Sequence, residues 1–323
     1  MGSRAGKYVF LALLAISCEA LGVALPPLPA LTFTSSFSVV RVQIKQAYDE
    51  ARSKPSDAAA NGKLAMVLDA YQQYAAAAVC YRRAHLLNPA SFRWIYNLGY
   101  AEMKLGRYSE AATAFRAALN MNPGFLPAKL NLAESLYSAG QLKASSELFL
   151  EILQKNPENV EAHYGLGRVE AAEGNAMAAA REIERACELF PEYGGAQYAL
   201  ALAYRKLGQP EKAAPHFAAY QANVTTVPPA VDPLRAEVQQ LDQGPLAIMR
   251  HGLDLAEGGN IEGAIQEYQR ALALDPRLIQ AHINLIQLYA RAGENDKAEE
   301  EYHKAVSLDP NRADCYYNYG VLM

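Results

Sequence analysis

Tyrosine and arginine side chains recur along this chain in a pattern that suits binding better than catalysis. Tyr96, Tyr164 and Tyr198 are separated by multiples of 34 residues, and Arg168 and Arg205 follow two of them closely. A tyrosine ring offers a large contact area at low entropic cost and keeps a hydroxyl for hydrogen bonds. A guanidinium group binds a carboxylate through two parallel hydrogen bonds. These residue types together favour recognition of a polar or acidic partner.

The sequence carries no motif of a known catalytic machinery. It lacks the GxSxG turn of serine hydrolases, the HExxH pair of zinc proteases and the GxxxxGK phosphate loop. Its six histidines are isolated, and we expect structural roles for them because a metal site needs clustered ligands. Cys80, Cys187 and Cys315 form no CxxC pair and are expected to be small buried residues without disulfides. We therefore expect no enzyme activity, no cofactor and no metal.

Composition indicates a folded chain that does not bind nucleic acid. The 323 residues are 51% hydrophobic and 20% charged, which is typical of a globular protein. The formal net charge is -4, and lysine and arginine are scattered among a slightly larger number of carboxylates. Binding to a phosphate backbone requires a basic stripe, which this distribution does not provide.

The first twenty residues have the pattern of a secretory signal. Arg4 and Lys7 give a basic start, an apolar stretch follows, and Cys18-Glu19-Ala20 is a small-residue cleavage pattern. The apolar run is too short to span a bilayer, which disfavours a membrane anchor. Residues 14–18 also resemble a bacterial lipoprotein box, in which Cys18 would be lipidated. We expect an exported protein, periplasmic or extracellular, with a lipid anchor as the alternative.

Prolines mark the repeat that positions the tyrosines and arginines. They are spaced 34 residues apart in two runs, namely Pro55, Pro89, Pro123, Pro157 and Pro191, then Pro276 and Pro310. A proline disfavours helix in the residue before it, so each one closes a unit. A fixed period of this length is typical of helix-turn-helix units that stack side by side. The pattern predicts an all-α fold, a right-handed α-solenoid of helical hairpins with seven units and a truncated eighth.

Each unit repeats small and large residues at fixed positions, counted from its first residue. The units begin at Ala58, Phe92, Leu126, Val160, Gly194, Pro245 and Ile279. Small residues occupy positions 8 and 20, where two antiparallel helices must approach closely. Large residues occupy position 24, where we expect them to pack against the next unit. In most units a glycine lies at the turn between the helices, where it can adopt the left-handed conformation.

The repeat is interrupted once, and the interruption sets the predicted boundaries. We expect a signal peptide at 1–20, a tether at 21–40, a capping helix at 41–57, a first array of five units at 58–222, a loop with an extra helix at 223–244, and a second array at 245–323. Asp232-Pro233 favours a helix start, so the extra helix should run from Pro233 to Leu241. This inserted half unit is predicted to shift or kink the superhelix.

The eighth unit starts at Ala313 and has no second helix before Met323. An array that ends in this way exposes an apolar face. We therefore expect that the natural gene continues, or that the last helix frays or pairs with a partner.

The repeat resembles the tetratricopeptide repeat family over roughly residues 58–323. The second unit carries the resemblance best, in Tyr96-Asn97-Leu98-Gly99, Gly106-Arg107-Tyr108, Ala111, Phe115, Ala118 and Pro123. Departures are local: Gln72 replaces a turn glycine, Ile286 a small residue at position 8, and Tyr220 an alanine at position 27.

The resemblance implies that the first helix of each unit lines a concave face, with positions 2, 5, 6, 9, 12 and 13 pointing inward. Asparagine recurs at position 6, where some members of the family use it to bind the backbone of an extended peptide; simple family consensus is the other explanation. The implied peptide-binding residues are Arg93, Tyr96, Asn97, Tyr100, Lys104, Asn131, Tyr137, Tyr164, Arg168, Tyr198, Arg205 and Lys206.

The leading hypothesis is a non-catalytic scaffold that binds an extended, preferably acidic segment of another protein in this groove. Two alternatives remain open. The array is the targeting or substrate-docking arm of an enzyme or complex whose catalytic part lies beyond Met323, or it is an envelope-assembly lipoprotein anchored at Cys18.

Overall fold

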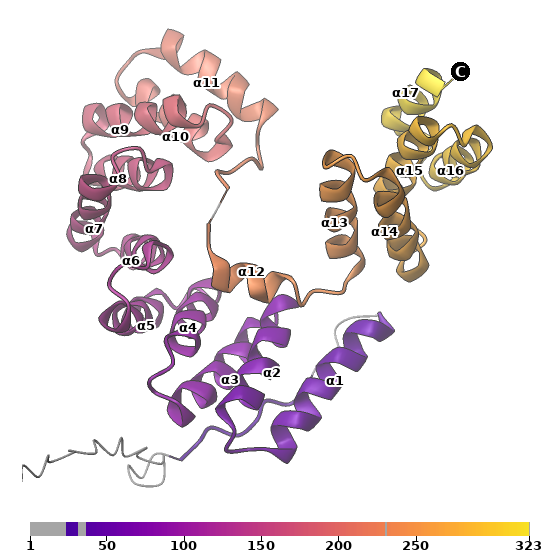
Figure 1. Cartoon of the computed structure of the whole chain (residues 1–323). Helices are drawn as coiled ribbons and strands as arrows, with labels where there is room; N and C mark the ends of the chain where they lie inside the picture. Colours follow the sequence, from indigo (N-terminus) through magenta and orange to yellow (C-terminus); the bar gives the residue numbers. More distant parts are fainter. Residues whose placement is uncertain (1–23, 32–36, 230, 323) are drawn as a thin grey trace, which may run out of the picture. The chain divides into compact units, whose positions relative to one another are not determined.

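A computed structural model gives the fold and describes residues 24–31, 37–229 and 231–322. The predicted signal peptide and Cys18 lie outside this part of the chain. Within it, every regular element is a helix, which confirms the all-α prediction (Figure 1). No helix in the described ranges is long and apolar enough to cross a membrane. The helices are α1 Ser38–Ser53, α2 Ala58–Ala70, α3 Tyr74–Leu87, α4 Phe92–Lys104, α5 Tyr108–Met121, α6 Leu126–Ser138, α7 Leu142–Lys155, α8 Val160–Glu173, α9 Ala176–Leu189, α10 Gly194–Lys206, α11 Pro210–Ala222, α12 Pro233–Gln239, α13 Pro245–Glu257, α14 Ile261–Leu274, α15 Ile279–Ala292, α16 Asn295–Leu308 and α17 Ala313–Leu322.

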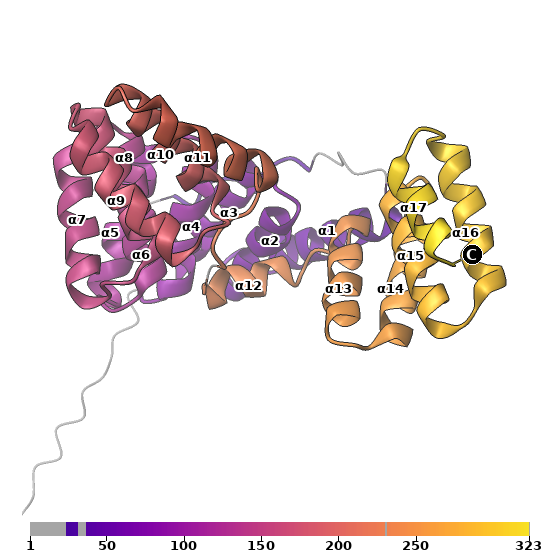
Figure 2. The ribbon, with the colours of Figure 1, turned by 90° about the horizontal axis from the view of Figure 1, so that it is seen from above.

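The chain divides into two compact units. The first contains the end of α1, the start of α2 and all of α3 to α11; the second contains most of α1, the end of α2 and α12 to α17. Within the first, each helix packs against the next, so that α4 to α11 form successive antiparallel hairpins (Figures 1 and 2). In the second, the hairpins α13–α14 and α15–α16 stack in the same way, and α17 packs on α15 and α16. This stacking confirms the predicted solenoid of helical hairpins.

Small residues bring the two helices of a hairpin into contact, as the repeat predicts. The Ser145 hydroxyl at position 20 donates a hydrogen bond to the carbonyl of Ala133 at position 8, at 2.8 Å. At Gly99, also a position 8, an added Cβ would lie 2.9 Å from the ring of Phe115, closer than real Cβ contacts allow. The close approach therefore depends on the absence of larger side chains at these positions.

The large residue at position 24 contacts both its own unit and the next one. Tyr268 lies against Gly252 of its own unit, where an added Cβ would be 3.3 Å from the ring. Its hydroxyl also accepts a hydrogen bond from the Asn284 amide of the following unit, at 2.9 Å. Phe149 fills the space that a side chain on Gly165 of the next unit would need. One bulky side chain thus couples two consecutive hairpins.

The turns between paired helices are left-handed, as predicted. Gly106, Gly140, Gly174, Gly208, Gly259 and Gly293 all have positive φ angles. In the first hairpin Gln72 takes this conformation with φ at 58°, despite its side chain. A left-handed residue lets the following amides bond the last carbonyls of the preceding helix, as Arg107 does to Glu102 at 3.0 Å.

A polar residue at position 4 bonds the start of several first helices to the rest of the unit. His163, Gln197 and His282 each donate to or accept from a second-helix side chain, and each also bonds the carbonyl of the proline six residues earlier. For His282 the partners are Glu301 and the carbonyl of Pro276. The sequence predicts structural roles for these histidines. In the structure His163 and His282 form hydrogen bonds that connect parts of the fold.

The His282–Glu301 pair should make the stability of α15 and α16 depend on pH. Burial alone would lower the pKa of His282, but its bonds to Glu301 and Pro276 raise that pKa overall. Burial would raise the pKa of Glu301, but His282 and Lys304 lower it overall. The histidine contribution is complete below its unfolded pKa near 6.5 and is lost as pH rises through the raised value. The glutamate contribution is complete above an unfolded pKa near 4.5 and is lost as pH falls through the lowered value.

We therefore expect the pair to protect α15 and α16 most between about pH 4.5 and 6.5. The His282→Gln variant keeps a side chain that can bond Pro276. Its loss of protection against hydrogen exchange should be largest between about pH 4.5 and 6.5 and should shrink above neutral pH. Native-state hydrogen exchange of the α15 and α16 amides, measured across this range, reports the local opening free energy. A difference between wild type and variant that stays constant with pH would contradict this role.

The inserted helix α12 is held by a buried ion pair within the second compact unit. Asp232 caps its start by accepting a hydrogen bond from the backbone amide of Arg235. The two terminal nitrogens of Arg235 then donate to the two carboxylate oxygens of Asp69 in α2, at 2.6 and 2.7 Å. Asp69 is fully buried, so the pair is shielded from water. The partners are 166 residues apart in sequence.

Polar contacts around this ion pair add to the attachment of α12. The Tyr71 hydroxyl forms a hydrogen bond with the Gln43 side chain of α1. The same hydroxyl accepts a hydrogen bond from the backbone amide of Gln243 at 3.0 Å. The Gln43 amide donates to the carbonyl of Leu241 at 3.0 Å. The insertion therefore bonds both α1 and the end of α2.

Removing one partner of the ion pair should destabilise the second unit. Arg235→Ala leaves the Asp69 carboxylate buried without its main partner, a change that costs about 3–5 kcal/mol in comparable cases. The double variant Asp69→Leu with Arg235→Met replaces the pair by apolar side chains and should recover most of that loss. Denaturant unfolding of the full chain measures both. Equal destabilisation by Arg235→Ala and by the double variant would contradict the role of the pair.

Candidate protein-binding surface

Arg168 is the centre of a cluster formed by α6 and α8. Its guanidinium lies 4.2 Å from the ring centroid of Tyr137 and 5.4 Å from that of Tyr164. The same group donates to a carboxylate oxygen of Glu134 at 2.8 Å. The Arg168 side chain remains 27% exposed and that of Glu134 37%. The cluster therefore presents a positioned cation, rather than a flexible one, to the surface.

A second tyrosine extends this cluster toward α10. Tyr193, immediately before α10, packs its ring against that of Tyr164 with the centroids 4.8 Å apart. An added Cβ on Gly195 would lie 3.3 Å from the Tyr164 hydroxyl, so glycine gives the ring room. Burial raises the pKa of both tyrosine hydroxyls, which keeps them protonated and able to donate hydrogen bonds at neutral pH.

Helix α10 carries exposed apolar and basic side chains, of which Leu202 and Lys206 line a cavity together with Arg168. Tyr198 and Leu202 are 43% and 41% exposed, and Arg205 and Lys206 are also exposed. Tyr198 rests on the ring of Tyr220 from α11, with centroids 5.0 Å apart. A small cavity of about 150 Å³ opens between α8, α9 and α10. Its lining includes Arg168, Ala171, Ile183, Ala199, Leu202 and Lys206.

Five predicted residues lie on α4, and they do not all reach this surface. Lys104 lies 5.2 Å over the ring of Tyr100, and Arg93 lies 5.9 Å from the ring of Trp94, so these pairs form within α4. Tyr96 and Asn97 are 0% exposed. Neither side chain offers exposed area to a ligand in this structure, and their role as groove contacts stays a prediction.

Tyr96 is buried because aromatic residues of its own unit surround it. Its ring contacts Phe92 and Phe115 and the edge of Phe125, with centroids 5.1 to 5.8 Å apart. The Tyr96 hydroxyl accepts a hydrogen bond from the Asn131 amide at 3.0 Å. The side-chain amide of Asn131 is therefore already hydrogen-bonded to the preceding unit. The amide of Asn284 is engaged in the same way by the Tyr268 hydroxyl. These contacts explain the recurrence of asparagine at position 6 by packing between units.

The structure adds residues that the sequence interpretation left out. Glu134 and Leu202 both lie at position 9, an inward position, and could have been found by listing every residue at that position. Tyr193 is the last residue of the fourth unit, the position that Phe125 holds in the second, and this shared aromatic position could have identified it. The surface formed by Glu134, Tyr137, Tyr164, Arg168, Tyr193, Tyr198, Leu202, Arg205 and Lys206 is called the Tyr/Arg surface below.

Models of one protein family match most of the repeated region. Tetratricopeptide repeat models match residues 102–169, 63–124 with 172–228, and 279–312, and a TPR repeat model matches 252–293. Together these ranges cover more than half of the chain, and they coincide with the stacked hairpins.

The chain belongs to the tetratricopeptide repeat family. Its repeats and its fold support a protein-interaction scaffold, and proteins of this family bind other proteins or peptides and are generally non-catalytic. A comparison with curated protein sequences finds no match.

Several solved structures are similar to this tetratricopeptide repeat chain. MamA from residue 41 to its end, from Desulfovibrio magneticus RS-1, is 17% identical, with 59% of this chain and 97% of that chain covered and a TM-score of 0.44. A further MamA crystal structure is 17% identical, covering 60% and 98%, with a TM-score of 0.42. YrrB, described as a TPR protein with an unusual peptide-binding site, is 25% identical, covering 64% and 97%, with a TM-score of 0.32. The family assignment rests on the family models and the repeat packing.

Proposed function

We propose that this protein is a non-catalytic scaffold whose Tyr/Arg surface holds an extended, acidic segment of another protein. The observation that carries the proposal is the placement of Arg168 between two tyrosine rings with part of its guanidinium exposed. Such a fixed cation loses little conformational freedom on binding a carboxylate. Arg205 and Lys206 add positive charge on α10, and Tyr198 and Leu202 supply apolar contact area next to it.

Glu134 gives this proposal a specific energetic consequence. Its carboxylate already accepts a hydrogen bond from Arg168, so it occupies the position that a carboxylate of the partner would use. A ligand carboxylate must displace Glu134 or share the guanidinium with it, and a second negative charge nearby weakens binding. Glu134 should therefore act as an internal competitor for an acidic partner.

Two substitutions should change affinity in opposite directions. Acidic peptides should dominate those selected by the full-length protein from a random peptide library. The strongest should bind Arg168→Gln roughly ten- to hundredfold more weakly, because hydrogen bonds to a charged group contribute about 1.5–3 kcal/mol. The Glu134→Gln variant should bind the same peptide more tightly than the wild type does, because the competing negative charge is gone. Fluorescence anisotropy measures both, and Lys143→Gln, an exposed lysine on α7, is the matched control.

The opposite signs separate a binding role from a purely structural one. If Arg168 and Glu134 only stabilised the fold, both substitutions would weaken binding together. Selection of neutral or basic peptides, or equal affinity of the wild type and Arg168→Gln, would contradict the proposal.

We also propose that the protein is exported, which rests on the basic and apolar pattern of residues 4–20. The test is the N-terminus of the protein isolated from the producing cell. A start after Ala20 supports export as a soluble protein, and an acylated Cys18 would instead identify the lipid-anchored form. Retention of the first twenty residues would contradict export.

A further inference from the structure

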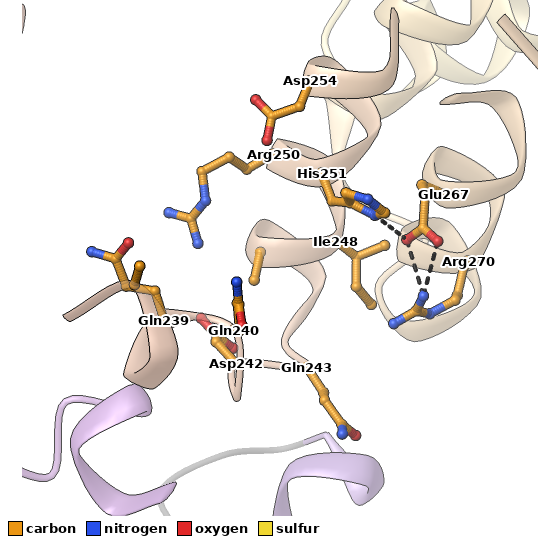
Figure 3. Close-up of a pocket in the computed structure, with 12 residues that line it drawn as sticks. Gln239, Gln240, Asp242, Gln243, Ile248, Arg250, His251, Asp254, Glu267 and Arg270 are labelled. Carbon is orange, nitrogen blue, oxygen red and sulfur yellow. Dashed lines mark hydrogen bonds and ion pairs between the residues drawn. The ribbon is translucent and has the colours of Figure 1, made fainter. Parts of the chain in front are cut away.

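The second compact unit contains a polar pocket that the repeat alone would not create. It lies between the inserted helix α12, the connection that follows it, and helices α13 and α14 (Figure 3). Its volume is about 680 Å³, within the range of small-molecule sites in proteins. Because α12 supplies one wall, the pocket exists only where half a unit has been inserted.

Some charged groups in this pocket are already neutralised by neighbours. A terminal nitrogen of Arg270 donates to both carboxylate oxygens of Glu267 at 3.0 Å, and His251 lies 3.7 Å from the same carboxylate (Figure 3). Asp242 accepts a hydrogen bond from the backbone amide of Gly244 at 2.8 Å. These groups shape the pocket and need no ligand.

Arg250 and Asp254 differ, because neither has an ion pair or side-chain hydrogen bond within the described residues. They lie one turn apart on α13 and line the same pocket (Figure 3). An arginine that precedes an aspartate by four residues has the less favourable orientation for a pair within a helix. The pocket thus offers one cation and one anion on successive turns of α13, neither engaged in an ion pair with a described residue.

Primary amides face this pair of charges from α12. In Figure 3 the side chains of Gln239 and Gln240 project toward the space beside Arg250. Neither amide makes a hydrogen bond to another described residue. A primary amide can both donate and accept hydrogen bonds, so it can serve a carboxylate or a polar side chain of a ligand.

We propose that this pocket binds a free α-amino acid. The ligand carboxylate bonds the Arg250 guanidinium, the ligand ammonium bonds the Asp254 carboxylate, and the glutamine amides receive a polar side chain. A purely anionic ligand would be repelled by Asp254, and a purely cationic one by Arg250. A zwitterion complements both charges, because each of its charged ends can form a charge-assisted hydrogen bond.

Calorimetric titration of the full-length protein with each common L-amino acid tests the proposal. At least one should bind, and its N-acetyl and carboxamide derivatives should bind at least about tenfold more weakly, because each lacks one of the two charges. Arg250→Gln and Asp254→Asn should each weaken binding to a similar extent, whereas Arg250→Lys should retain part of it. Arg291→Gln, at an exposed arginine of α15 outside the pocket, should bind as the wild type does.

Both substituted positions are exposed, and circular dichroism melting shows whether each variant keeps the fold. The proposal is overturned if no amino acid binds the wild type, if both derivatives bind as well as the free amino acid, or if the Gln and Asn variants retain full affinity. Because this site and the Tyr/Arg surface share no residue, failure here leaves the proposed scaffold function untouched.

Discussion

The bulky side chain at position 24 of each unit is the contact on which the stack depends. It lies against its own first helix and against the first helix of the next unit, so that neither hairpin can move without the other. Tyr268 shows both contacts, with Gly252 on one side and Asn284 on the other. Phe149 occupies the space beside Gly165 in the same manner. Because interiors are packed at crystal-like density, these contacts leave little freedom in the distance between units.

This packing divides the first helices into structural and functional positions. Position 6 contacts the preceding unit, which explains why it holds an asparagine where a tyrosine hydroxyl needs a donor, and a glycine where a phenylalanine ring needs room. Positions 9 and 13 remain at the surface and carry Glu134, Arg168, Leu202 and Lys206. The rigid stack thereby fixes the spacing of a cation, several aromatic rings and an apolar side chain, which favours binding with little entropic loss.

Much of the fold could be predicted because its signals are local and periodic. The closing prolines, the turn glycines and the small residues at positions 8 and 20 each act within one hairpin, so their spacing alone was sufficient. Tyr96 could not be placed in this way. It shares position 5 with Tyr198, yet Tyr96 is covered by Phe125, the last residue of its unit, whereas Tyr198 is exposed. Exposure depends on neighbours 30 residues away, and no repeat pattern records it.

The insertion shows the same limit at longer range. Asp232-Pro233 predicts the start of a helix, and α12 begins at Pro233. Nothing in the sequence pairs Arg235 with Asp69, because the residues are 166 positions apart and the repeat does not relate them. That pair, and the pocket beside α13, belong to the single place where the repeat is broken. The buried ion pair and the polar pocket therefore both lie where the 34-residue repeat is interrupted.

The account depends most on where a partner contacts the stack. Photo-crosslinking in the producing cell, with a photoreactive amino acid in place of Leu202 on the Tyr/Arg surface or of Met177 on α9, tests this most directly. Met177 is the more exposed of the two, at 77% against 41%, so accessibility alone would favour it. The account predicts protein adducts from position 202 that disappear when Arg168 is also replaced. Adducts that form equally or preferentially from position 177 would contradict it.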